Sequence, residues 1–341
     1  MKDLSFLKGA PIGQLILPGC KVEDLTPIRD LPLKDVWLNG HSVAALAPLR
    51  GSGMPLERLE LSAGTFADLT PLVGLRLKEL YLDRCPNVAD VAILTNIPTL
   101  EKLTVPALAR NIESLRMLPH LQRLSFSETT SYPAIPDTVA SALWVEWPKL
   151  GWLRALRQAD FRPKLVNRLA DRTWEIDLDN TPIHDLSPLA GATIGKLTMQ
   201  KTDVTDLAPL QGMPLKELNL QGTKVADLSP LRGMRRRYLN LNARPVTNLS
   251  VLRGMPLVEL RMAWCPQITD LSPLAECPKL TSITLPPKVE NIEFLRHVST
   301  LRRISYTENF KENTQIFQPD KTAPQLWQEY AAKTKAERKQ P

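Results

Sequence analysis

The sequence predicts an α/β solenoid in which short parallel strands alternate with short helical turns. A segment of 21 to 22 residues recurs through most of the 341-residue chain. Each copy contains a Leu-x-x-Leu-x-Leu pattern, followed by a phrase such as Asp-Leu-Ser-Pro-Leu. One such unit is too small to bury its own leucines, so neighbouring units must stack.

The leucine pattern in each unit predicts a strand. In residues 215–220, which read Leu-Lys-Glu-Leu-Asn-Leu, the alternation around Leu218 and Leu220 has a period of two residues. This period is typical of a strand with one buried face. We therefore expect these leucines to point into the core and their neighbours to point outwards.

The Asp-Leu-Ser-Pro-Leu phrase predicts a turn that leads into a short helix. Serine is a favoured helix cap, and proline suits the first helical position, where no amide donor is needed. The phrase accounts for many of the 30 prolines. An aspartate at its start can accept hydrogen bonds from free amides of the turn, which explains these residues better than a calcium ladder does. The recurrent aspartates are Asp24, Asp68, Asp90, Asp185, Asp206, Asp227 and Asp270.

The units resemble leucine-rich repeats, especially the short internalin-like type. This resemblance covers residues 3–126 and 174–307, and it implies a horseshoe with short concave strands and short helical turns. The position of the family's asparagine ladder holds other residues here, among them Cys20, Cys85 and Cys265. Because threonine and glycine share this position in other units, we expect small buried ladder residues rather than a metal site.

One unit departs from the pattern in its core. Arg236 stands where the neighbouring units have Leu215 and Leu257. We expect either a distorted unit or an arginine whose stem turns outwards to reach solvent.

A longer duplication predicts two tandem arrays, each closed by a helical cap. Residues 103–128 match residues 283–308, and the aromatic segment Leu-Trp-Val-Glu-Trp at 143–147 matches Leu-Trp-Gln-Glu-Tyr at 326–330. The last unit of a solenoid leaves an apolar face open, which an aromatic helix can cover. The predicted parts are a first array (1–126), a helical cap and basic linker (127–172), a second array (173–308), and a C-terminal helical cap and basic tail (309–341).

The charge pattern limits the classes of partner. Of the formal net charge of +7, residues 148–172 carry +5 and residues 321–341 carry +3, which leaves −1 for the rest. This distribution does not favour a long nucleic-acid groove, so we expect no specific nucleic-acid partner. The sequence has no apolar run long enough to span a membrane, and four cysteines without a C-x-x-C pair favour a reducing compartment. We expect a cytoplasmic monomer, unless a missing upstream segment carries an export signal or a membrane span.

Motifs for catalysis are absent from the sequence. The four histidines, His41, His120, His184 and His297, fall at unrelated repeat positions, and none belongs to an H-E-x-x-H arrangement. We therefore expect no enzyme activity, no catalytic residue, no cofactor and no metal ligand.

The outward strand faces supply the candidate protein-binding residues. Tryptophan, tyrosine and arginine dominate the energetics of protein interfaces, and a concave surface would place them side by side. The alternative is a face that is merely solvated. The candidates are Trp37, Arg58, Glu60 and Tyr81 in the first array, and Asn219, Tyr238, Asn240 and Arg261 in the second.

The predicted function is a non-catalytic scaffold that binds a protein or peptide on its concave strand face. The phrase Asp-Leu-Ser-Pro-Leu-x-Gly-Met-Pro-Leu and the terminal T-x-x-x-L-W-x-E-Y also resemble repeat regions that follow the catalytic domain of some bacterial Hanks-type serine/threonine kinases. No glycine-rich phosphate loop, His-Arg-Asp loop or Asp-Phe-Gly occurs in this chain. The resemblance implies an alternative, a regulatory portion of a kinase whose catalytic domain lies upstream. A second alternative is a surface adhesin.

Overall fold

A computed structural model describes most of the chain. The described residues are 2–17, 19–38, 42–51, 53–128, 135–159, 162–243, 245–289, 291–311 and 316–337. They divide into two compact units: unit 1 is Met1–Gln158 with Lys164–Arg172, and unit 2 is Ala159–Pro163 with Thr173–Pro341.

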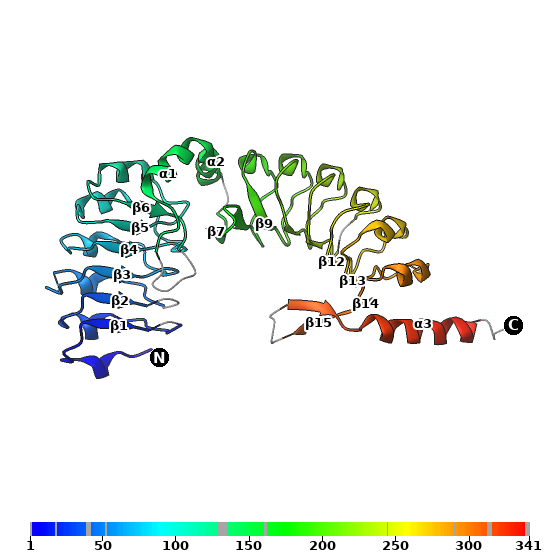
Figure 1. Cartoon of the computed structure of the whole chain (residues 1–341), viewed down its shortest axis with the longest axis horizontal. Helices are drawn as coiled ribbons and strands as arrows, with labels where there is room; N and C mark the ends of the chain where they lie inside the picture. The colour runs from blue at the N-terminus through cyan, green and yellow to red at the C-terminus, as the bar shows by residue number, and fades with distance from the viewer. Residues whose placement is uncertain are drawn as a thin grey trace. The chain divides into compact units, whose positions relative to one another are not determined.

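Unit 1 is built on a sheet of short parallel strands stacked in sequence order (Figure 1). Each strand supplies one inward apolar residue between two outward positions, as the period of two predicts. The strands in the described part of this sheet are β1 (Gln14–Ile16), β2 (Asp35–Trp37), β3 (Arg58–Glu60), β4 (Glu79–Tyr81), β5 (Lys102–Thr104) and β6 (Arg123–Ser125).

Unit 1 also contains the helices that follow strand β6. They are α1 (Ala140–Glu146), a short 3-10 helix (Trp147–Leu150) and α2 (Gly151–Gln158). Strand β7 (Leu165–Arg168) lies in the later segment of this unit.

Unit 2 repeats the parallel arrangement and adds an antiparallel hairpin and a long helix. Its parallel strands are β8 (Trp174–Asp177), β9 (Ile194–Thr198), β10 (Glu217–Asn219), β11 (Tyr238–Asn240), β12 (Glu259–Arg261), β13 (Ser282–Thr284) and β14 (Arg303–Ser305). The hairpin is β15 (Glu308–Lys311) with β16 (Ile316–Pro319), and the helix is α3 (Ala323–Glu337).

Short 3-10 turns return the chain from one strand to the next. They are Ser5–Leu7, Thr26–Ile28, Ala47–Leu49, Thr70–Leu72, Ala92–Asn96 and Ile112–Met117 in unit 1. In unit 2 they are Ser187–Leu189, Ala208–Leu210, Ser229–Leu231, Ser250–Leu252, Ser272–Glu276 and Glu293–His297.

The aspartate of each phrase, rather than its serine, caps these turns. Asp227 Oδ1 accepts a hydrogen bond from the Ser229 amide at 2.8 Å, and the Ser229 hydroxyl donates to the other carboxylate oxygen. The same contact joins Asp24 to the Thr26 amide. The expected role of the aspartates is therefore confirmed, whereas the expected serine cap is wrong because the serine side chain is itself a donor to the carboxylate.

The core is a set of stacked leucine columns, one member from each turn of the chain. Leu59, Leu80 and Leu103 follow one another on neighbouring strands and are fully buried. Burial of such a side chain contributes about 1.5 to 3 kcal/mol. Each side chain is buried only when the next repeat packs against it. The fold is therefore a leucine-rich-repeat solenoid, as the sequence predicts.

Two cysteines at the ladder position, Cys85 and Cys265, are buried and form hydrogen bonds with nearby carbonyl groups. Cys85 Sγ donates to the Leu61 carbonyl at 3.3 Å, and Cys265 Sγ donates to the Leu241 carbonyl at 2.9 Å. Burial raises the pKa of the Cys85 thiol to about 12. These thiols therefore act as small ladder side chains, with the carbonyl contact that an asparagine would otherwise make.

A helix covers the last parallel strand in each unit: α1 packs against β6, and α3 packs against β14. The buried anchors are Leu143 and Leu326. Trp327, which the sequence suggests as a buried cap residue, is half-buried, and the Arg296 guanidinium lies 4.9 Å from its ring centroid.

Arg236 is the strongest departure from a leucine core, and the expectation that its side chain reaches solvent is wrong. The residue is fully buried, and its Nη2 contacts Met234 Sδ at 2.9 Å. No described residue forms a hydrogen bond with its Nε or Nη1. Burial alone lowers the pKa of the Arg236 guanidinium to about 9.

We predict that Arg236→Leu stabilises unit 2. The change removes a buried guanidinium and introduces leucine, the residue that the neighbouring repeats have at this position as Leu215 and Leu257. The free energy of unfolding should therefore rise by about 1 to 4 kcal/mol. Urea unfolding followed by circular dichroism measures the effect. The exposed Arg235→Leu is the matched control and should change stability by less than about 0.5 kcal/mol. A lower stability for Arg236→Leu would contradict the prediction.

Candidate protein-binding face

Each strand of unit 1 presents two outward positions, which line up into two columns along the sheet. The first strand positions form column 1, and the third positions form column 2. The parallel register places Trp37 beside Glu60, and Glu60 beside Tyr81, in column 2. These three candidate residues therefore lie side by side in one column.

Column 1 of unit 1 is a ladder of alternating charges. Arg58 Nε lies 3.1 Å from a Glu79 carboxylate oxygen and 3.9 Å from one of Asp35, and Lys102 Nζ lies 2.7 Å from the other Glu79 oxygen. In unit 2, Lys196 pairs in the same way with Glu175. The charges of this column are largely compensated within the face.

Column 2 of unit 1 is buried, which corrects the expected exposure of its residues. Trp37 is 9% exposed, and Glu60 and Tyr81 are 0% exposed. The Trp37 and Tyr81 rings lie 6.3 Å apart, and the Arg58 guanidinium lies 4.3 Å from the Trp37 ring centroid. The aromatic side chains pack against this arginine, so their contact area is used within the fold.

The candidates in unit 2 are also drawn into internal contacts. Asn240 is fully buried, while Asn219 is 9% and Arg261 is 7% exposed. Tyr238 is half-buried, and its hydroxyl accepts a hydrogen bond from Arg261 Nη1 at 3.2 Å. The four residues lie on neighbouring strands β10 to β12, as predicted, but not on an open surface.

In each unit, described residues that follow β6 or β14 fold back on the sheet. We use the name strap 1 for residues 126–128 and 135–139, and the name strap 2 for residues 306–311 and 316–322. The return arm of strap 1 pairs with β6, where the Leu124 amide donates to Thr138 O at 3.2 Å. The return arm of strap 2 pairs with β14, where the Ile304 amide donates to Lys321 O at 3.3 Å. Both straps therefore satisfy the exposed edge of the last strand.

Strap 2 inserts a glutamate among the strands of unit 2. Glu308 receives hydrogen bonds from Arg261 Nε at 2.7 Å, from Thr284 Oγ1 at 2.6 Å and from Asn242 Nδ2 at 3.1 Å, and a second bond from Arg261 Nη2. Burial opposes ionisation of Glu308, but these donors outweigh it, and the pKa of Glu308 is lowered. Glu308 is held as a carboxylate.

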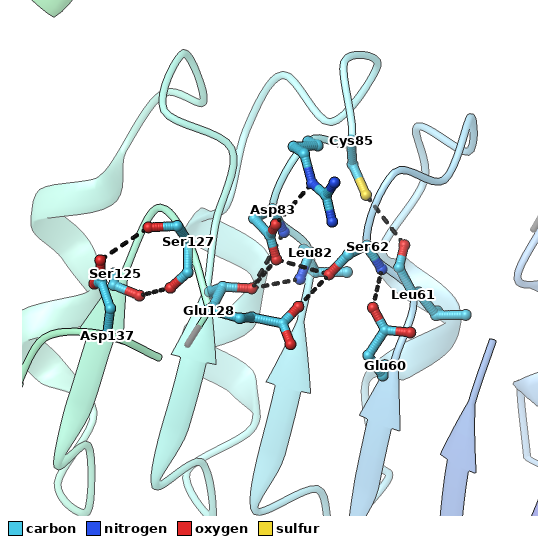
Figure 2. Close-up of polar contacts among 12 residues, drawn as sticks. Glu60, Leu61, Ser62, Leu82, Asp83, Cys85, Ser125, Ser127, Glu128 and Asp137 are labelled. Carbon is cyan, nitrogen blue, oxygen red and sulfur yellow. Dashed lines mark hydrogen bonds and ion pairs between the residues drawn. The ribbon is translucent and has the colours of Figure 1, made fainter. Parts of the chain in front are cut away.

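Strap 1 inserts the equivalent glutamate into an acidic environment (Figure 2). The Ser62 hydroxyl lies 2.7 Å from Asp83 Oδ1 and 2.8 Å from Glu128 Oε1. The Ser62 amide donates to Glu60 at 3.0 Å. Three carboxyl groups therefore gather around one serine, and Thr104 donates to Asp83 at 2.9 Å.

The straps and their glutamates were missed by the sequence reasoning. A signal was present, because Glu128 and Glu308 occupy the same position in the long duplication of residues 103–128 and 283–308. The partners of both glutamates lie 66 residues earlier in the chain, at Ser62 and Asn242.

Large aromatic side chains remain exposed on unit 2. Trp264 is 75% exposed, and Phe310 and Phe317 on the hairpin are 46% and 49% exposed. Trp264 has φ 59°, a backbone region that the fold fills with Gly222 or Ala243 at equivalent positions. A bulky residue in this region is strained, so an exposed tryptophan here does not stabilise the fold.

Metal binding and membrane insertion are two other possibilities for the described part of the chain. Among those residues no group of His, Cys, Asp or Glu side chains is arranged to hold a metal ion. Within the same residues, no helix combines the length and apolar character needed to cross a membrane.

Comparison with known proteins gives similarity to solved structures only. No family model and no curated protein matches the chain. An internalin (InlF) from Listeria monocytogenes is 19% identical, with a TM-score of 0.48 over 87% of this chain and 88% of that chain. The functional domain of InlJ from Listeria monocytogenes is 16% identical, with a TM-score of 0.42 over 90% of this chain and 71% of that one. A leucine-rich-repeat protein of Leptospira interrogans is 15% identical, with a TM-score of 0.36 over 85% of this chain and 75% of that one.

We predict that Trp37→Ala destabilises unit 1. The side chain is buried against Arg58 and Tyr81, so its loss should lower the free energy of unfolding by about 3 to 5 kcal/mol. Urea unfolding measures this loss. The control is Trp264→Ala, which removes an exposed side chain and should leave stability within about 0.5 kcal/mol. Equal effects of the two substitutions would show that the burial of Trp37 contributes nothing.

Proposed function

We propose that this chain is a non-catalytic scaffold that binds a protein partner through an aromatic surface of unit 2. This surface consists of Trp264, Phe310 and Phe317. The observation that carries the proposal is the 75% exposure of Trp264 in a strained backbone conformation. Exposed aromatic side chains of this kind are typical anchors of protein interfaces.

Two of these aromatic side chains, Phe310 and Phe317, are grouped near Arg261. Arg261 ends strand β12, three residues before Trp264, and its guanidinium lies 5.6 Å from the Phe317 ring centroid. Phe317 in turn lies 5.2 Å from Phe310. The salt bridge between Arg261 and Glu308 fixes the hairpin on the strands, so the aromatic groups are held in place before a partner binds.

The proposal departs from the predicted concave site in one respect. Column 2 of both units is occupied by contacts within the chain, whereas the aromatic surface lies on the loop after β12 and on the hairpin. The predicted class of partner, a protein or peptide, is retained.

The test is affinity capture with the full chain, followed by mass spectrometry. A partner retained by the wild type should be lost with Trp264→Ala, because an interface anchor contributes about 2 kcal/mol or more, which is roughly a 30-fold change in affinity. The matched control is Met117→Ala in unit 1, where the side chain is 78% exposed.

The control separates specific binding from adhesion to any apolar surface. Retention of the same partner by both variants would place the interface elsewhere. Loss of the partner with both variants would indicate non-specific capture.

The kinase-like phrases support a second candidate, a regulatory portion of a serine/threonine kinase. The terminal T-x-x-x-L-W-x-E-Y phrase lies at the start of α3, where Leu326 is buried. A catalytic domain encoded in frame upstream would support this candidate. An upstream export signal would instead favour the adhesin alternative.

A further inference from the structure

We propose that Glu60 is a pH-sensitive switch for the stability of unit 1: its buried carboxyl group carries a proton in the folded unit, and the unit becomes less stable when that proton is lost. Glu60 is the last residue of strand β3, so it lies in column 2 between Trp37 and Tyr81. The proposal concerns unit 1, whereas the proposed function concerns an aromatic surface of unit 2.

The environment of Glu60 does not compensate a negative charge. The residue is 0% exposed, and its neighbours along column 2 are the aromatic side chains of Trp37 and Tyr81. Its Oε1 accepts a hydrogen bond from the Ser62 amide at 3.0 Å, while no described residue forms a hydrogen bond with its Oε2. A buried carboxylate without a cation or further donors is costly, which favours the protonated form.

Two arginines near Glu60, Arg58 and Arg84, already pair with other carboxylates. Arg58 Nε lies 3.1 Å from Glu79, and Arg84 Nε lies 3.1 Å from Asp83. The Arg84 side chain is also 41% exposed, so solvent weakens its effect on Glu60.

The other titratable groups around Glu60 are all acids. Among the described residues of β2, β4 and strap 1, and of the loop residues 82–85, these groups are Asp35, Glu79, Tyr81, Asp83, Cys85, Glu128 and Asp137. Since none of them can carry a positive charge, none can stabilise an ionised Glu60 by a salt bridge.

Unit 2 places neutral side chains at the equivalent position. Asn219 and Asn240 end strands β10 and β11, as Glu60 ends β3. Asn240 Oδ1 accepts a hydrogen bond from the Asn242 amide at 2.9 Å, which is the contact that Glu60 makes with Ser62, and Asn219 contacts the amide two residues further on in the same way. A protonated carboxyl group offers the same carbonyl acceptor as an amide. An uncharged acceptor therefore suffices at this position.

The pKa of Glu60 agrees with this geometry and gives the direction of the switch. Burial raises the pKa from its ordinary value of 4.5 to about 7, although the hydrogen bonds from Ser62 oppose the rise. The folded unit thus binds this proton more tightly than the unfolded chain does. The contribution of Glu60 to stability is complete below pH 4.5, is lost progressively as the pH rises to about 7, and then levels off.

Amide hydrogen exchange of the full chain, measured from pH 5 to pH 8 without any partner, tests the proposal. The reporter is the Leu61 amide, which follows Glu60 and donates to Tyr81 O at 3.0 Å. Observed rates are divided by the intrinsic rate at each pH. The protection of Leu61 should fall by at least about tenfold across this range, because one released proton contributes up to tenfold per pH unit between the two pKa values.

Two matched substitutions isolate the contribution of Glu60 from that of Glu128, whose pKa burial raises to about 8. Glu60→Gln keeps an uncharged acceptor for the Ser62 amide. The protection of Leu61 in this variant, divided by that in the wild type, should therefore rise by at least about tenfold from pH 5 to pH 8. The control is Glu57→Gln. Glu57 is exposed, and its hydrogen bond with Lys78 lowers its pKa, so this change should leave the pH response of Leu61 unaltered.

A second measurement decides the case if Glu60→Gln fails to fold. The carboxyl carbon-13 shift of Glu60 in the wild-type chain should titrate with a midpoint above about pH 6. A midpoint near the ordinary value, or a ratio of protections that stays constant from pH 5 to pH 8, would overturn the proposal. Neither result depends on a partner. Failure to capture a protein through Trp264 would contradict the proposed function and leave both results as they stand.

Discussion

The structure depends on the burial of each leucine between neighbouring repeats of 21 to 22 residues. Leu59 and Leu80 are fully buried because the strands on either side cover them. In any such stack, the last repeat has no following repeat to cover it. Its apolar side chains and the backbone amide and carbonyl groups of its strand would therefore be exposed. The straps and the helices α1 and α3 cover these groups. The return arm of each strap forms hydrogen bonds with the last strand, and the buried Leu143 of α1 and Leu326 of α3 cover the apolar side chains.

The two straps have the same backbone arrangement, but the side chains around their glutamates differ in charge. Both straps place a glutamate against residues that lie two or three strands earlier in the chain. In unit 2 the carboxylate meets Arg261, Asn242 and Thr284, all of them donors. In unit 1 it lies near Asp83 and contacts a serine, and burial together with Asp83 raises the pKa of Glu128 to about 8. Because the geometry is shared, the difference in charge state comes from a few side chains and not from the fold.

The position of a charged side chain on a strand decides whether it can form an ion pair with a neighbouring repeat. In column 1, Arg58 lies between Asp35 and Glu79, so the charges largely compensate one another along the stack. Among the described residues Arg236 has no such partner, because its position points into the core, where neighbouring repeats contribute leucines. A charged side chain is therefore accommodated easily on the outward columns and only at a cost in stability on the inward ones.

The sequence by itself determined the repeat period, the burial of Leu218 and Leu220, the turn aspartates and the alignment of Trp37, Glu60 and Tyr81 on neighbouring strands. These features follow from local patterns with periods of 2 and about 21 residues, which each unit expresses independently. Only the tertiary structure decided which outward residues stay exposed, because a strap from the end of each parallel stack returns to strands about 66 residues earlier. The charge state of Glu128 and the burial of Arg236 depend in the same way on side chains that pack together without being neighbours in sequence, and no local pattern records that packing.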